Sequence, residues 1–165
     1  MRGGKACFVL LVLAPSLLNA QASNAASEPL ADIVGTWQSD TVGGTTARSV
    51  CVWSPLGRGV ICEQAITTPG GIRHTLNAFV ADSGNQNFFY YGISQPGEDV
   101  PATFLEITGH VWVYGGRRKA SDGLYHHTIN DFTAMNGSYV WRQEFSRDGI
   151  QWTVQRQGRA VKQRS

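Results

Sequence analysis

Residues 138–158 read SYVWRQEFSRDGIQWTVQRQG, two alternating segments joined by Asp148-Gly149. An Asp-Gly pair supplies the two central residues of a type I′ turn, in which both residues adopt a positive φ. A turn centred on this pair predicts a β-hairpin and fixes the register of its strands. The expected cross-strand pairs are Phe145 with Trp152, Gln143 with Val154, and Trp141 with Arg156.

The two faces of the predicted hairpin differ in character. The six paired residues form one face, which is mainly aromatic and apolar. The other face is polar and carries Arg142, Glu144, Ser146, Gln151, Thr153, Gln155 and Gln157. Because side chains alternate along a strand, this pattern predicts a sheet with one face on a core and the other in solvent.

The rest of the chain also predicts strands. No long window has helical periodicity, and short runs rich in Val, Ile, Thr and aromatic residues are separated by clusters of Gly, Asn and Asp. Gly115-Gly116 is expected as a turn and Gln95–Pro101 as a loop. The predicted strands are 35–41, 46–54, 59–68, 72–82, 86–94, 102–108, 110–115, 123–133, 138–147 and 150–161.

Short connections favour antiparallel pairing of consecutive strands. About ten twisted strands must close on themselves or split into two packed sheets, since a large open sheet exposes an aggregation-prone edge. The predicted fold class is therefore all-β: a closed, antiparallel, up-and-down β-barrel with a short N-terminal helix. A β-sandwich is the alternative.

The N-terminal segment has the pattern of a secretory signal peptide. Arg2 and Lys5 precede an apolar run over residues 6–18, and Ala20-Gln21-Ala22 follows it. The run is shorter than the roughly 20 apolar residues that a membrane-spanning helix needs. We therefore expect residues 1–22 to be removed, no stable membrane insertion, and a periplasmic or secreted protein.

Two further segments follow the leader. Residues 23–34 are expected to form a linker and a short helix, with Ser27 as its N-cap, Pro29 in its first turn and Gly35 just past its end. The barrel is then expected over residues 35–162, and the chain has room for one domain only.

The charge of the chain argues against a nucleic-acid partner. The formal net charge of +2 is accounted for by Arg2 and Lys5, so the remainder is neutral. Apart from the short cluster Arg117-Arg118-Lys119, the basic residues are scattered along the predicted strands. Residues 111–165 are more basic than residues 23–110 and could meet anionic lipid or nucleic acid, but the short cluster and the scattered charges favour neither partner.

Cys51 and Cys62 flank the predicted turn within SVCVWSPLGRGVICE, residues 49–63. A turn centred on Leu56-Gly57 places the two cysteines directly opposite each other, at a spacing that a disulfide tolerates. Since an exported protein meets an oxidising compartment, we expect them to form a disulfide. Two buried free thiols are the alternative.

Three patterns along the chain suggest a family. Gly35-Thr36-Trp37 is a G-x-W at the start of the first strand, followed by WSPLG at residues 53–57 and YVWRQEFSRDGIQW at residues 139–152. In this order they resemble a group of secreted bacterial calycin-like proteins, related to the lipocalins and the fatty-acid-binding proteins. The sequence lacks a lipocalin T-D-Y motif and the Arg-x-Tyr pair that binds the carboxylate of a fatty acid. The resemblance therefore does not imply the identity of a ligand.

The resemblance implies a way of closing the barrel. In the related families the tryptophan of the G-x-W pattern closes one end, and a cation from the last strand covers its ring. Here Gly35 and Trp37 would take these positions. Arg159 is the cation expected over the Trp37 ring. Arg156 and Lys162 are the two other basic residues that the last strand offers for this position.

The four histidines do not indicate a metal site. They are His74, His110, His126 and His127. The last two are adjacent on a predicted strand and point to opposite faces, so only one could serve a given site. We therefore expect no bound metal and no cofactor.

An enzymatic alternative rests on one predicted strand. His127 and Asp131 share a face with Tyr125, and a group of this kind inside the barrel could catalyse proton transfer in a small hydrolase, isomerase or cyclase. The same residues also describe a partly polar barrel interior without catalysis. The sequence favours this second interpretation and a protein that is not an enzyme.

A barrel of this size is wide enough that its side chains do not fill it, and aromatic walls with a few polar groups are typical of a small-molecule pocket. The sequence therefore predicts an extracytoplasmic protein that binds a small hydrophobic or amphipathic ligand. An interaction module with a filled interior is a further alternative. The expected ligand-binding residues are Trp53, Tyr139, Trp141 and Trp152, with Arg156 facing an anionic end of the ligand.

Overall fold

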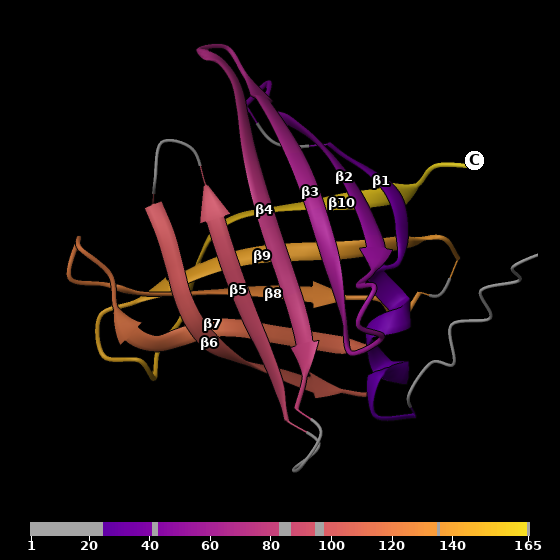
Figure 1. Cartoon of the computed structure of the whole chain (residues 1–165). Coiled ribbons are helices and arrows are strands. Elements are labelled where there is room, and N and C mark those ends of the chain that lie inside the picture. Colours follow the sequence, from indigo (N-terminus) through magenta and orange to yellow (C-terminus); the bar gives the residue numbers. More distant parts are fainter. Residues whose placement is uncertain (1–24, 41–42, 83–86, 95–97, 135, 165) are drawn as a thin grey trace, which may run out of the picture.

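The computed structural model describes residues 25–40, 43–82, 87–94, 98–134 and 136–164, with the backbone alone at 25–27, 94 and 98–102. Over these residues the chain is a closed antiparallel β-barrel of ten strands with one short 3-10 helix (Figure 1). The predicted barrel is confirmed, and the sandwich alternative was wrong. The predicted signal peptide lies outside the described residues.

The strands follow one another around the barrel in chain order. Apart from β6 and β7, they lie within a few residues of the predicted strands. Their bounds are β1 (Gly35–Asp40), β2 (Thr46–Trp53), β3 (Gly59–Thr68), β4 (Gly71–Ala81), β5 (Phe88–Ser94), β6 (Glu98–Thr108), β7 (Val111–Lys119), β8 (Tyr125–Asp131), β9 (Ser138–Ser146) and β10 (Thr153–Lys162).

The two exceptions are longer than predicted. β6 begins at Glu98, so the loop expected over Gln95–Pro101 was wrong from residue 98 onward. β7 continues through Gly115-Gly116, where both glycines have a positive φ and the register with β8 shifts. A Cβ at Gly115 would lie 2.6 Å from the carbonyl oxygen of His126. The expected turn is therefore a β-bulge, which needs glycine for both its φ and the close approach of β8.

The first and last strands close the barrel through a short seam. Among the described residues four pairs join β1 to β10, from Trp37 with Lys162 to Asp40 with Arg159, whereas ten join β3 to β4. Ala160, at the middle of the seam, is fully buried. The seam joins segments from the two ends of the domain, so barrel closure depends on a small number of long-range contacts.

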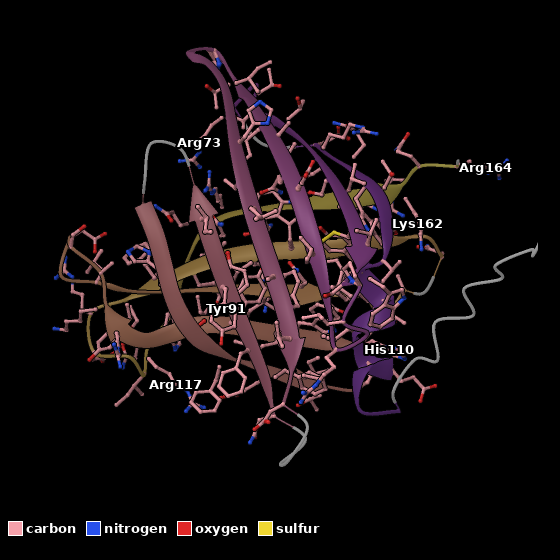
Figure 2. The ribbon with its side chains drawn as sticks, in the orientation of Figure 1. Arg73, Tyr91, His110, Arg117, Lys162 and Arg164 are labelled. Atoms are coloured by element: carbon pink, nitrogen blue, oxygen red, sulfur yellow. A yellow bond between two sulfur atoms is a disulfide. The ribbon has the colours of Figure 1, made fainter. Side chains whose placement is uncertain are left out.

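The helix η1 (Ala25–Ile33) packs at one end of the barrel (Figure 1). Ser27, expected as its N-cap, lies inside the helix. Leu30 and Ile33 are buried in the core. Asp32 pairs with Nδ1 of His110, in the connection between β6 and β7, at 2.9 Å (Figure 2). The helix is therefore held to the barrel by apolar packing and by this contact.

Aromatic rings fill the barrel at the η1 end. Trp37, Tyr139 and Phe132 are buried, with centroid separations of 4.9 Å between Trp37 and Tyr139 and 4.6 Å between Phe132 and Tyr139. Phe79 and Trp112 continue the cluster at 5.3 Å. Tilted and edge-on rings at these separations attract one another beyond their area burial. This end of the barrel is therefore closed by a packed core.

The connection between β9 and β10 is longer than the predicted two-residue turn, because β9 ends at Ser146 and β10 begins at Thr153. The predicted pairs, Phe145 with Trp152, Gln143 with Val154 and Trp141 with Arg156, were wrong. The observed pairs are Phe145 with Thr153, Gln143 with Arg156 and Trp141 with Gly158, with a bulge between Val154 and Arg156.

Side-chain oxygens explain the longer connection. The Ser146 hydroxyl accepts hydrogen bonds from the N–H groups of Asp148 and Gly149, at 3.3 and 2.8 Å. Oδ1 of Asp148 accepts from the N–H groups of Ile150 and Gln151, both at 2.9 Å. Four backbone donors are thereby satisfied within the loop, which competes with the ladder that a two-residue turn would have made.

This loop predicts a local response to acid. The backbone N–H groups of Gln151 and Ile150, followed by the Ser146 hydroxyl, lower the pKa of Asp148 from 3.8 to about 2. A carboxylate whose pKa is lower in the folded state stabilises that state above its unfolded pKa and stops doing so as the pH falls through its folded pKa. We therefore expect the protection factors of the Ile150 and Gln151 amides, which are their exchange rates relative to the intrinsic rates at the same pH, to fall between about pH 4 and pH 2, measured by NMR.

The matched control for this experiment is Asp148→Asn, which keeps an oxygen acceptor but cannot titrate. In that variant the acid-dependent step in amide exchange should disappear. A carboxyl resonance of Asp148 that titrates near its ordinary value would contradict the hydrogen-bonded loop.

Candidate ligand-binding site

The inward-facing residues leave a cavity of about 170 Å³ that reaches from Ile33 of η1 and the aromatic core to Arg156 on β10. Along β8 the residues that line it are Thr128 and Asn130, and along β2 they are Ala47, Ser49 and Cys51. This alternation is that of strands with one face inward. An engineered apolar cavity of about 150 Å³ binds benzene, so the space here suits a molecule of about one ring.

One wall of the cavity is a chain of polar side chains across β2 to β5. Nε2 of Gln64 donates to the Ser49 hydroxyl at 3.1 Å, and the Thr75 hydroxyl donates to Oε1 of Gln64 at 3.3 Å. Nδ2 of Asn77 donates to the Thr75 hydroxyl at 3.3 Å, and the Tyr90 hydroxyl donates to Oδ1 of Asn77 at 2.7 Å. Because these groups hydrogen-bond to one another, they can remain in the interior without a large cost.

Three tyrosines add neutral donors to the lining. Burial raises the pKa of Tyr90 and of Tyr139 to about 12, and it raises the pKa of Tyr114 well above its usual value. All three phenols are therefore protonated at neutral pH. The Tyr114 hydroxyl also accepts a hydrogen bond from Nδ2 of Asn130 at 3.4 Å.

Trp141 provides an aromatic wall on β9. Its indole N–H donates to the Ser39 hydroxyl at 2.8 Å, which fixes the ring against β1. On β10, Gly158 lies directly beneath the ring: a Cβ there would be 2.7 Å from Cζ2 of Trp141 and 2.6 Å from the carbonyl oxygen of Asp40. The absence of a side chain at Gly158 therefore lets the indole lie flat inside the barrel.

Gly158→Ala is expected to displace Trp141 and to lower the free energy of unfolding by about 1–3 kcal/mol, the usual cost of overpacking. The reason is that one of the two close atoms belongs to the backbone and cannot move aside easily. Chemical unfolding and the tryptophan emission spectrum would measure the two effects. The control is Gly70→Ala, where the nearest atom to a new Cβ is 3.7 Å away. Equal stability of the two variants would contradict the packing of Trp141 on Gly158.

Arg156 is the one charged residue among the described residues that line the cavity. Its Nε donates to Oε1 of Gln143, its cross-strand partner. Partial burial lowers the pKa of Arg156, and the positive charge of Arg73 on β4 lowers it further. Arg73 lies at the end of the barrel away from η1 (Figure 2). This end of the cavity therefore carries two nearby positive charges.

The structure brings three of the predicted ligand-binding residues to the cavity and leaves two outside it. Tyr139, Trp141 and Arg156 line it. Trp53 is partly buried and packs on the core at the η1 end instead. Trp152 stacks on the ring of His127, with a centroid separation of 3.7 Å.

The predicted catalytic group does not assemble in the cavity. Since Thr128 and Asn130 face inward, His127 and Asp131 lie on the outer face of β8. His127 pairs through Nε2 with Glu144 at 2.7 Å. Asp131 accepts hydrogen bonds from Thr133, which lower its pKa.

Tyr125, the third member of the predicted group, lies at the other end of β8 from Asp131. Its ring lies 5.5 Å from the ammonium group of Lys119. The interior position expected for His127, Asp131 and Tyr125 was therefore wrong, and none of the three lines the cavity.

The cation over Trp37 also differs from the expected residue. Nζ of Lys162 lies 5.3 Å from the centroid of the Trp37 ring, whereas Arg159 donates to the Ser138 hydroxyl at 2.8 Å. Lys162 is the cross-strand partner of Trp37, and a Cβ at Gly35 would lie 2.4 Å from its Cε. Glycine at position 35 therefore makes room for the lysine side chain on the tryptophan.

The predicted disulfide is present and belongs to the same site. Cys51 and Cys62 are cross-strand partners on β2 and β3 and are bonded to each other. Both are buried and line the cavity. The bridge is thus part of the cavity floor beside Phe79.

Sequence reasoning missed the polar wall of the cavity. Ser49, Gln64 and Asn77 were not predicted as site residues. A signal was available, because a disulfide between Cys51 and Cys62 requires both side chains to share one face. Alternation then places Ser49 and Gln64 on that same face.

No protein-family model matches the chain, and no curated protein matches its sequence. The site is therefore interpreted from its geometry. In the described part of the chain, no group of three or more His, Cys, Asp or Glu residues is placed to hold a metal ion. No helix there combines the length and the apolar character needed to cross a membrane.

Proposed function

We propose that this protein is an extracytoplasmic binding protein that holds a small apolar or amphipathic molecule inside its barrel. The observation that carries the proposal is the cavity of about 170 Å³, lined by described inward-facing side chains from nine of the ten strands. Binding pockets combine aromatic surfaces with a few placed polar groups. Phe79, Tyr139 and Trp141 supply the surfaces here, and Asn77 and Arg156 are among the polar groups.

Two further features support the location and the kind of barrel. A disulfide in a buried position is typical of proteins that fold in an oxidising compartment, in agreement with the leader expected at residues 1–22. Trp37, with Lys162 over its ring, has the arrangement that the resemblance to calycin-like proteins implies. A periplasmic or secreted member of that group is the assignment we propose.

The proposal is tested by asking whether the purified protein carries a bound molecule. Native mass spectrometry, followed by solvent extraction of the protein, should reveal a co-purified compound or reversible binding of a small aromatic probe. Ser49→Phe should abolish both, because the new ring would enter the cavity from its wall on β2.

Val52→Phe is the matched control, since Val52 is 54% exposed on the opposite face of the same strand. Binding should be unchanged in this variant. If neither the unmodified protein nor Val52→Phe retains or binds any small molecule, the binding function is wrong and the interior acts only as a core.

A further inference from the structure

The described lining of the cavity carries one positive charge and no negative charge. Arg156 is the one charged side chain among the described residues of the lining, and no carboxylate is among them. In the described part of the chain, neither Arg156 nor Arg73 forms a salt bridge; the arginines that do are Arg117 and Arg142. Two nearby positive charges that no described carboxylate pairs with repel each other, so an anion bound between them would be stabilised.

The donors of Arg156 suit one kind of anion. Its Nε is used by Gln143, and none of the described residues accepts a hydrogen bond from its two terminal nitrogens. A guanidinium group with free terminal nitrogens presents parallel donors that match the two oxygens of a carboxylate. Gln143 holds the side chain on β10 in the position where such a contact would form.

The position of Arg156 makes it accessible to an anion that enters the cavity from solvent. Among the described residues the last pair of β1 with β10 at this end is Asp40 with Arg159, and Arg156 lies three residues before Arg159 on β10, outside these pairs. Its side chain is exposed to solvent while still lining the cavity. Arg73 is the cross-strand partner of Ile66, which lines the same end of the cavity. Both positive charges therefore lie at the end through which a ligand would enter.

The remaining walls limit the size and polarity of the rest of the ligand. The volume is close to that of the cavity of about 150 Å³ that accepts a single benzene ring, and well below the roughly 300 Å³ at which drug-sized pockets begin. Trp141 and Phe79 offer ring surfaces. Asn77 and Tyr90 offer polar atoms from β4 and β5, strands that are not neighbours of β10 in the barrel. A long alkyl chain fits neither the volume nor the polar wall.

From this geometry we infer that the ligand is a monocyclic carboxylic acid, with its carboxylate on Arg156, its ring against Trp141 and any ring hydroxyl near Asn77 and Tyr90. The inference rests on the proposed binding function and specifies its ligand class. The paired donors of Arg156, with the positive charge of Arg73 nearby, favour a carboxylate at one end of the ligand, and the neutral polar groups of the lining favour a small ring at the other. The proposed chemistry differs from that of a fatty-acid carrier, whose ligand is longer and has no polar far end.

The test compares four probes by isothermal titration calorimetry, with tryptophan fluorescence as a second readout. The probes are 4-hydroxybenzoate, its uncharged analogue 4-hydroxybenzamide, dodecanoate and inorganic phosphate. We expect 4-hydroxybenzoate to bind with a dissociation constant below about 1 mM. It should bind at least about tenfold more tightly than the amide, as the loss of a charged hydrogen bond predicts. Dodecanoate and phosphate should bind more weakly than the acid.

Substitutions of Arg156 test whether this residue causes the preference for the acid over the amide. Arg156→Gln should bring the affinity for the acid down to that for the amide, and Arg156→Lys should give an intermediate affinity because it keeps charge but loses the paired donors. Arg48→Gln removes the same charge from the outer face of β2 and should leave both affinities unchanged.

The possible failures are distinguishable from failure of the proposed function. Equal affinity for acid and amide, with both lost in Ser49→Phe, would overturn the anionic ligand and leave the binding function in place. Tighter binding of dodecanoate or of phosphate would overturn the ring-sized carboxylate. Absence of binding by every probe, together with absence of a co-purified molecule, would contradict both proposals.

Discussion

Trp37→Ala is expected to lower the free energy of unfolding by about 3–5 kcal/mol, the range for removing a large buried ring. Trp37 is 3% exposed and contacts the rings of Tyr139 and Phe132. Its indole N–H donates to the carbonyl oxygen of Ile33 at 2.6 Å, which ties η1 to β1. The substitution therefore leaves a cavity at the closed end and also loosens the helix. Urea unfolding followed by circular dichroism would measure the loss.

Two further variants separate the parts of this effect. Trp37→Phe keeps a ring but leaves the Ile33 carbonyl without its donor, so it should give an intermediate loss of about 1–3 kcal/mol. Ile72→Ala, at a residue 64% exposed on β4, should change stability by less than about 0.5 kcal/mol. If Trp37→Ala behaved like Ile72→Ala, closure of the barrel at this end would not depend on the tryptophan.

Breaking the Cys51–Cys62 bridge is expected to lower the free energy of unfolding by about 3 kcal/mol, the loop-entropy value for a loop of this length. The bridge closes a sequence separation of 11 residues. The expected loss is a large part of the 5–15 kcal/mol that is typical of a whole domain. Unfolding of the protein in urea, with and without a reductant, would measure it directly without changing the volume of the core.

Cys51→Ala/Cys62→Ala provides the control for the reductant. It should be less stable than the unmodified protein and should not respond to the reductant. Because both cysteines line the cavity, its affinity for the probes should also fall. Insensitivity of the unmodified protein to reduction would show that the β2–β3 pairing alone already fixes this hairpin.

The strands and the disulfide could be predicted because their signals are local. Cys51 and Cys62 lie on either side of a short turn, so their pairing needs only the turn centre, and the observed register agrees with it. The FFYY segment, residues 88–91, predicts two rings on each face, and the structure places Tyr90 at the cavity and Tyr91 45% exposed outside (Figure 2). The alternation of side chains along a single strand is enough to predict that Tyr90 and Tyr91 lie on opposite faces.

The register of the last hairpin could not be read in the same way. Asp148-Gly149 predicts a two-residue turn from its backbone preferences alone. The Ser146 and Asp148 side chains instead bind four backbone N–H groups, which stabilises a longer loop. A bulge in β10 then brings Arg156 opposite Gln143. Arg156 lines the cavity, although the cross-strand pair from which its inward position was predicted was wrong, and its contact with a ligand stays a prediction.

The inward face of β8 could not be predicted from the sequence, because the cavity that it lines is polar. Its two faces, one with His127 and Asp131 and the other with Thr128 and Asn130, are both polar. Hydrophobicity therefore does not distinguish inside from outside on this strand. The interior is lined by hydroxyl, amide and phenol groups that satisfy one another, so the inward face is settled only by contacts between strands far apart in the sequence.

The short seam between β1 and β10 also bears on how the chain folds. Contacts between residues so distant in sequence raise the contact order, and a high contact order slows folding. The barrel cannot be completed until residues 159–162 are available to pair with β1. Until that moment β1 and β9 each lack a partner along one side, and such strands readily add a strand from another chain. These two strands are therefore most prone to pair with another chain in the interval before the ten residues of β10 are in place.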